Sequence, residues 1–250
     1  MKKIYILPNL VTTANLTCGI FSMVHSIQGN FTRAAWFVII GAICDSLDGR
    51  IARFARATSA FGVQYDSLSD LTSFGIAPAI LLYSLVLKDY GIGMSAVALY
   101  AICAALRLAR FNVSAEEKDP GKLAKIRKGY FQGLPSPASA GLIVTAVLVQ
   151  AEFPVVSNEI LGVAALVLAF GLGALMVSNV PFPSFKEVNW RSKGKAWILL
   201  IPVIFILCAV GAPELTLFIT GYLYLTLGLG WAIYLCWFKD RNKGETLVPQ

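Results

Sequence analysis

Four aspartates stand at regular spacing inside otherwise apolar sequence. Asp45 and Asp48 are three residues apart near the end of one apolar run, and Asp66 and Asp70 are four apart near the start of the next. Residues at these spacings share one face of a helix. A carboxylate within an apolar helix is a functional candidate, because burying its charge in lipid is costly. Ordinary ion pairing at helix ends can explain one such aspartate, but it is a poor explanation for four.

The short basic loop between the two apolar runs makes their helices antiparallel neighbours, so the four carboxylates converge at one end of a helical hairpin. Like charges in a medium of low dielectric constant repel strongly, and a cation must offset them. Ligation by oxygen alone suits Mg²⁺ or Mn²⁺. The sequence therefore predicts a site for two such ions, with Asp45, Asp48, Asp66 and Asp70 as ligands.

The residues around the aspartates suggest a phosphate-bearing substrate. Gly49, Ala52 and Gly62 leave room for a ligand to approach the backbone, and Arg53 offers a planar fork that suits phosphate. Metal ions held by these carboxylates could neutralise the charge of such a phosphate group, and a carboxylate could act as a general base. No serine–histidine pair is needed, and the only histidine, His25, is expected near the opposite membrane face.

The composition places these helices in a membrane. Of the 250 residues, 57% are hydrophobic and 14% are charged, against roughly 25% charged residues in soluble domains. We predict an all-α polytopic bundle of about eight transmembrane spans that forms a single integral membrane domain, 1–250. A window of about 20 apolar residues places the spans at 8–28, 34–54, 66–88, 92–112, 136–151, 158–179, 196–211 and 213–237.

The basic residues predict the orientation. All 21 lysines and arginines except Arg33 and Lys88 fall at the termini or on the side of the membrane that carries the aspartate cluster. The positive-inside rule places that side, both termini and the active site in the cytoplasm. The net charge of +7 then favours an anionic membrane surface and phosphate-bearing substrates, rather than nucleic acid, as partners.

The segment 45–70 reads D-x2-D-G-x2-A-R-x8-G-x3-D-x3-D, and it resembles the signature of the CDP-alcohol phosphatidyltransferases at every specified position. The resemblance implies that Asp45, Asp48 and Asp66 bind divalent cations, and that Asp70 joins the metal site and acts as the general base. It also implies a set of residues that bind the CDP-lipid: Pro8, Asn9, Thr12, Gly49, Ala52, Arg53, Ser59 and Gly62.

Two further segments, 107–112 and 129–137, resemble the branch of this family that uses L-serine as the acceptor. The implied reaction joins L-serine to CDP-diacylglycerol in the bacterial inner membrane, and the family likeness also implies a homodimer. The expected acceptor contacts are Arg107, Arg110, Asn112 and Ser136. An arginine fork can bind a carboxylate with two hydrogen bonds, although arginines at such helix ends also serve as topology anchors.

Other interpretations remain open from the sequence. The same family includes enzymes whose acceptor is glycerol 3-phosphate or inositol phosphate, and an ether-lipid donor is compatible with the same residues. An ion-coupled transporter would be expected to carry charges at the membrane midplane and inverted repeats. The aspartates here gather toward one face and no repeat is evident, so an enzyme is favoured over a transporter or a non-catalytic metal-binding protein.

Overall fold

The computed structural model describes residues 6–54, 59–116, 130–154, 157–183, 208 and 210–244. The chain divides into two compact units, one drawn from Met1–Glu117 and Pro135–Val177 and the other from Lys118–Leu134 and Ser178–Gln250. The first unit contains the aspartates. Its elements are α1 (Ile6–Ile27), α2 (Phe31–Phe54), α3 (Ala60–Asp70), the π-helix η2 (Leu71–Ile76), α4 (Ala77–Leu85), the 3₁₀ turn η3 (Leu87–Asp89), α5 (Gly93–Glu116), α7 (Ser136–Glu152) and α8 (Asn158–Val177).

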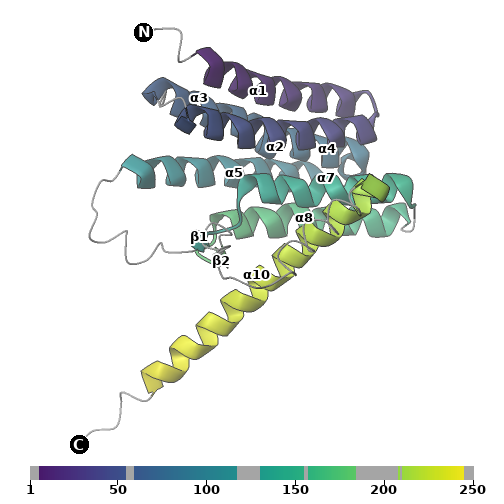
Figure 1. The fold of residues 1–250 in the computed structure, drawn as a ribbon. Helices are drawn as coiled ribbons and strands as arrows, with labels where there is room; N and C mark the ends of the chain where they lie inside the picture. Colours follow the sequence, from purple (N-terminus) through teal and green to yellow (C-terminus); the bar gives the residue numbers. More distant parts are fainter. Residues whose placement is uncertain are drawn as a thin grey trace, which may run out of the picture. The chain divides into compact units, whose positions relative to one another are not determined.

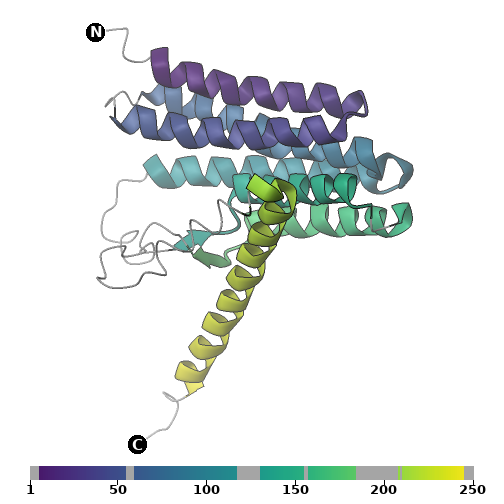
Figure 2. The same cartoon turned by 45° about the vertical axis from the view of Figure 1, so that its right-hand side comes forward.

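The helices of the first unit run side by side, with α1 along α2 and α5 along α8 (Figures 1 and 2). A tight turn joins α1 to α2, and Gly29 at its centre has φ +79°, a conformation that favours glycine. This turn folds α2 back along α1. The aspartate-bearing end of α2 therefore lies beside the beginning of α1.

A single continuous helical segment, Ala60–Leu85, carries the second aspartate pair. Ser59 caps its start, with the Ser59 Oγ accepting a hydrogen bond of 3.0 Å from the Gly62 N–H. The segment changes from α-helix to π-helix directly after Asp70 and returns to α-helix at Ala77. One-turn π segments within α-helices occur frequently at functional sites, and here the widened turn begins beside a candidate catalytic residue.

Five helices in the described part of the chain are long and apolar enough to cross a membrane: Asn9–Ile27, Ala60–Leu85, Gly93–Val113, Asn158–Val177 and Pro213–Tyr234. α7 is apolar but shorter, and α2 carries charged residues in its last turns. The protein is thus an all-α integral membrane protein, as predicted. Every expected span coincides with a helix except 196–211, most of which lies outside the described residues, so the count of eight stays a prediction.

The second unit contains α10 (Pro213–Gly244) and a short antiparallel pair of strands, β1 (Tyr130–Gln132) and β2 (Pro181–Pro183). Gly133, at φ +74°, follows β1 and donates a hydrogen bond of 2.9 Å from its N–H to the Val180 carbonyl. The sequence did not predict this pair of strands. Each strand has only three residues, and two of the three in β2 are prolines, so neither strand shows a periodic pattern. The expected break before the last helix is confirmed, with Pro213 at the first helical position of α10.

Candidate metal and active site

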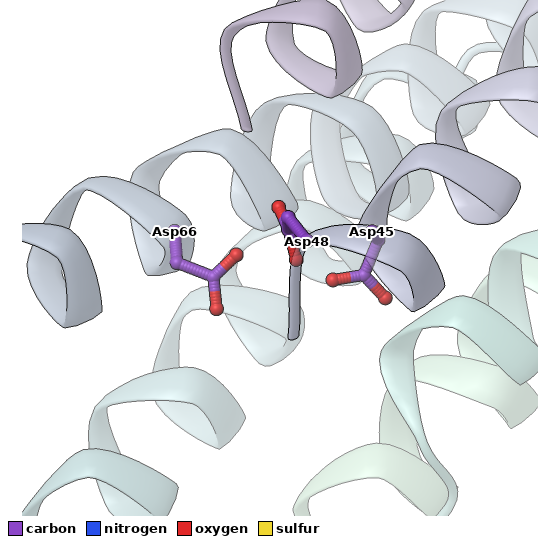
Figure 3. A group of neighbouring side chains, drawn as sticks. All are labelled: Asp45, Asp48 and Asp66. Atoms are coloured by element: carbon purple, nitrogen blue, oxygen red, sulfur yellow. The ribbon is translucent and has the colours of Figure 1, made fainter. Parts of the chain in front are cut away.

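Three aspartates from two helices meet at one end of the first unit. Asp45 and Asp48 come from the last turns of α2 and Asp66 from α3, and Figure 3 shows their carboxylates pointing toward one another. One carboxylate oxygen from each lies within 4.8 Å of the other two. The convergence predicted from the spacing is therefore present for these three residues.

This aspartate triad (Asp45, Asp48 and Asp66) fits a divalent cation. Asp66 Oδ1 is buried and has no hydrogen-bond partner, and a buried polar atom without a partner is costly unless something else satisfies it. Oxygens on opposite sides of Mg²⁺ are separated by about 4.2 Å, so a small closure of the three side chains would enclose an ion. Asp66 is also repelled by the neighbouring carboxylates of Asp45, Asp48 and Asp70, which increases the need for a positive charge.

Asp70 lies beside this triad but outside it. Its carboxyl is in hydrogen-bonding contact with that of Asp45, and its Oδ1 accepts a hydrogen bond of 3.2 Å from Asn15 Nδ2. The structure thus brings all four predicted aspartates together but separates three potential ligands from a fourth residue held by other contacts. Asp70 as a fourth metal ligand remains a prediction.

α1 packs against both aspartate-bearing helices through polar side chains. Thr12 Oγ1 donates to Asp48 Oδ2 at 2.9 Å, so α1 orients a residue of the triad. In return, Ser69 Oγ donates to the Thr12 carbonyl at 3.1 Å, and Ser73 Oγ donates to the Asn15 carbonyl at 2.9 Å. These hydrogen bonds join α1 to α3 and η2 beside the triad.

Asn15, Ser69 and Ser73 were not predicted from the sequence to belong to the site. A signal for Asn15 was available, because Thr12 and Asn15 are three residues apart and therefore share one face of an apolar helix. Both side chains are buried. Polar residues buried on one face of a membrane helix must find partners within the protein, and here each partner is an aspartate.

Several residues expected to bind the CDP-lipid lie together at the start of α3. A Cβ placed on Gly62 would lie 3.2 Å from Ser59 Oγ and 3.6 Å from Asn9 Oδ1, which puts these three residues beside one another. Gly49 follows Asp48 on α2. The side chains of Pro8, Ala52 and Arg53 lie outside the described residues, so their predicted contacts remain predictions.

Of the four residues expected to bind the acceptor, Arg107 and Ser136 contact each other, whereas Asn112 and Arg110 contact other parts of the first unit. Arg107 donates to Ser136 Oγ at 3.1 Å, and Asn112 donates to the Oγ of Ser67, the neighbour of Asp66 in sequence, at 2.8 Å. Arg110 donates to the carbonyls of Val177 and Met176 at the end of α8, at 2.9 and 3.3 Å. Arg110 therefore stabilises the end of a helix, whereas Asn112 is linked to the aspartate-bearing segment.

His25 lies near the end of α1 that is remote from the triad and stacks on Phe37 with ring centroids 5.3 Å apart. This position agrees with the expectation that the histidine is not part of the site. The polar chemistry beside the triad comes instead from carboxylates, hydroxyls and one buried amide.

Comparisons with known proteins identify the family. The family model described as CDP-alcohol phosphatidyltransferase matches residues 5–174. The chain is 37% identical over 249 residues to a CDP-diacylglycerol–serine O-phosphatidyltransferase of Helicobacter pylori strain J99, covering 98% of this chain and 99% of the relative. Proteins of the same name from Methanocaldococcus jannaschii and Bacillus subtilis are 30% and 31% identical, over 87% and 72% of this chain and 90% and 92% of theirs. The chain therefore belongs to the CDP-alcohol phosphatidyltransferase family.

Proposed function

We propose that this protein transfers the phosphatidyl group of CDP-diacylglycerol to the hydroxyl of L-serine, giving phosphatidylserine and CMP. The observation that carries the proposal is the aspartate triad, with Asp70 beside it, at one end of a membrane-embedded helical bundle. Relatives named for the serine reaction that align over nearly the whole chain support the choice of acceptor. The triad would bind the donor, CDP-diacylglycerol, and does not distinguish between acceptors. The choice of L-serine therefore depends on these relatives.

The proposed reaction breaks one bond of the pyrophosphate. The serine hydroxyl oxygen attacks the phosphorus nearer the lipid, the bond from that phosphorus to the bridging oxygen breaks, and CMP leaves with the bond electrons. Divalent cations held by Asp45, Asp48 and Asp66 would supply the positive charge that a pyrophosphate and its departing phosphate require. Asp70 accepts the hydroxyl proton as the new oxygen–phosphorus bond forms.

The neighbouring residues would bind the two substrates. Asn9, Ser59 and Gly62 lie together beside the start of α3, where they can contact the CDP group, and Gly49 and Arg53 belong to the same proposed surface. Asn112 reaches the aspartate-bearing helix through Ser67, so it is the expected acceptor residue most closely linked to the triad. Arg107 is a candidate for the serine carboxylate, because it contacts Ser136, another residue expected to bind the acceptor. Arg110 contacts the end of α8 instead.

The proposal includes the membrane in which the protein lies and its orientation there. We infer a bacterial inner membrane from the resemblance to the serine-using branch of the family. The basic residues that gather at the aspartate end of the bundle support placing that end and both termini in the cytoplasm. We also propose a homodimer, on the resemblance to the family alone.

An acceptor panel tests the reaction. The purified protein in detergent with Mn²⁺ and CDP-diacylglycerol is offered radiolabelled serine, glycerol 3-phosphate and inositol phosphate in separate assays. We expect label in the lipid fraction from serine and release of an equal amount of CMP. Incorporation from glycerol 3-phosphate or inositol phosphate but not from serine would overturn the acceptor, and no CMP release with any of the three would overturn the reaction.

The role of Asp70 has its own test. Asp70→Asn removes the proton acceptor with little change in shape, so we expect turnover to fall by at least about 100-fold while binding of CDP-diacylglycerol is largely kept. The matched control is Glu159→Gln, which removes a carboxylate near the start of α8, at the other end of the bundle, and should leave turnover unchanged. Near-normal turnover by Asp70→Asn would show that this residue is not the base.

A further inference from the structure

Asn15 is a buried amide in the middle of an apolar helix. The residue has no exposed surface, and its Nδ2 donates a hydrogen bond of 3.2 Å to Asp70 Oδ1. A buried amide is costly to retain where an apolar residue would pack as well. Its one side-chain hydrogen bond goes to the carboxyl that the proposed function uses as the base, and this singles Asn15 out among the buried polar residues of α1.

The surroundings of Asn15 fix the direction of its amide. Asn15 Oδ1 has no hydrogen-bond partner and faces α2 at Gly41, where an added Cβ would lie 3.0 Å from it. If the amide were reversed, its oxygen would face the Asp70 carboxylate, and two acceptors would meet with no proton between them. A glycine at position 41 thus accommodates the oxygen, and the NH₂ group is left to face Asp70.

The backbone beneath Asn15 is held as well. Ser73, in η2, donates to the Asn15 carbonyl at 2.9 Å, and Asp70 directly precedes η2 in the chain. A Cβ on Gly19, one turn further along α1, would lie 2.6 Å from Ser73 Oγ and 3.0 Å from Ser73 Cα. The close approach of α1 and η2 therefore fixes the separation between the amide and the carboxylate that it contacts.

We infer that Asn15 is a positioning residue for Asp70: its amide holds one carboxylate oxygen by a hydrogen bond and so keeps the carboxyl oriented to take the proton from the acceptor hydroxyl. The inference rests on the proposed function. Thr12, three residues earlier on α1, contacts Asp48 in the same way. One face of α1 thus orients both an aspartate of the triad and the proposed base.

The test separates turnover from binding. Asn15→Leu removes the amide at similar size, and misplacing a reacting group by about 1 Å can cost on the order of 100-fold in rate. We therefore expect kcat to fall by about 10- to 100-fold, with the KM for serine and the Kd for CDP-diacylglycerol changed by less than about twofold. The control is Ser22→Ala, which should keep the wild-type kcat. Ser22 is another buried polar residue of α1, and its Oγ has no hydrogen-bond partner among the described residues.

A second variant gives the same information if Asn15→Leu does not fold. Gly41→Ala leaves Asn15 in place but adds a methyl group 3.0 Å from its Oδ1, so the amide must shift by a few tenths of an ångström. We expect kcat to fall several-fold, again without a matching loss of CDP-diacylglycerol binding. A wild-type kcat in both variants, or a loss of donor binding with unchanged kcat, would overturn the inference.

The proposed function can fail separately. If Asp70→Asn retains turnover, Asp70 is not the base and the proposed mechanism is wrong, whatever Asn15 does. If Asp70→Asn is inactive while the folded Asn15→Leu and Gly41→Ala variants turn over at the wild-type rate, only the positioning role is wrong.

Discussion

At the scale of single residues, a substitution of Thr12 tests whether the aspartate triad binds metal. Its hydroxyl donates to Asp48 Oδ2 at 2.9 Å in a buried contact, and residues that orient a metal ligand typically contribute about 10- to 100-fold to metal affinity. Thr12→Val keeps the shape and removes the donor. We expect the Mn²⁺ concentration for half-maximal activity to rise by about 10-fold or more, measured by titrating Mn²⁺ into chelator-treated enzyme.

Thr17→Val is the matched control for this titration. Thr17 lies on the same helix, and in the part of the chain that the structure describes its hydroxyl donates to the Thr13 carbonyl of that helix rather than to an aspartate. This variant should leave the Mn²⁺ dependence unchanged. An unchanged Mn²⁺ dependence in Thr12→Val would instead favour the direct contact with the CDP-lipid that the sequence resemblance implies for Thr12. A chelator that leaves the wild-type activity intact would contradict metal binding by the triad altogether.

For single residues, one part of the site could be predicted from the sequence alone and another part could not. The spacing of Asp45, Asp48 and Asp66 was sufficient to predict their convergence, because helix periodicity and a short connection leave few other arrangements. The position of Asp70 outside the triad could not be read this way, since it depends on Asn15 and on packing between α1 and η2. Contacts between segments more than 50 residues apart carry no periodic signal.

At the scale of elements, the site depends on the close approach of α1 to η2. Gly19 has no side chain where an added Cβ would lie 3.0 Å from the Ser73 Cα, a backbone atom that cannot rotate away. We expect Gly19→Ala to force the two helices apart and to lower the free energy of unfolding by about 1–3 kcal/mol. The measurement is thermal unfolding of the detergent-solubilised variant, compared with wild type at the same lipid and detergent concentration.

Gly171→Ala supplies the control for helix packing, because a Cβ at this position in α8 would meet nothing within 4 Å. Alanine favours helix more than glycine does by about 1 kcal/mol, so this variant should be as stable as wild type or slightly more so. Equal stability of the two variants would show that α1 and η2 are not packed as closely as this geometry requires.

Hydropathy predicted the helices well but not their internal breaks. The expected span 66–88 is part of a longer helical segment that begins at Ala60 and passes through the π-helix η2. A π turn inserts one residue into an otherwise regular helix, and average hydropathy does not register it. The strands β1 and β2 were missed for a similar reason, because they are too short to show the alternation that marks a strand.

At the scale of the whole molecule, the basic residues predict which compartment the aspartate triad faces. At the other end of the first unit, Arg33 lies in the first turn of α2 and Lys88 lies in η3. These are the two basic residues that lie away from the cytoplasmic side in the predicted topology. Asp89 is exposed at that end, and Ala60 is exposed at the aspartate end beside Ser59. In a variant without native cysteines, we expect Asp89→Cys to react with a membrane-impermeant maleimide in intact cells, and Ala60→Cys to react only after the membrane is opened. The reverse labelling pattern would contradict the orientation that the basic residues predict, and would place the aspartate triad on the other side of the membrane.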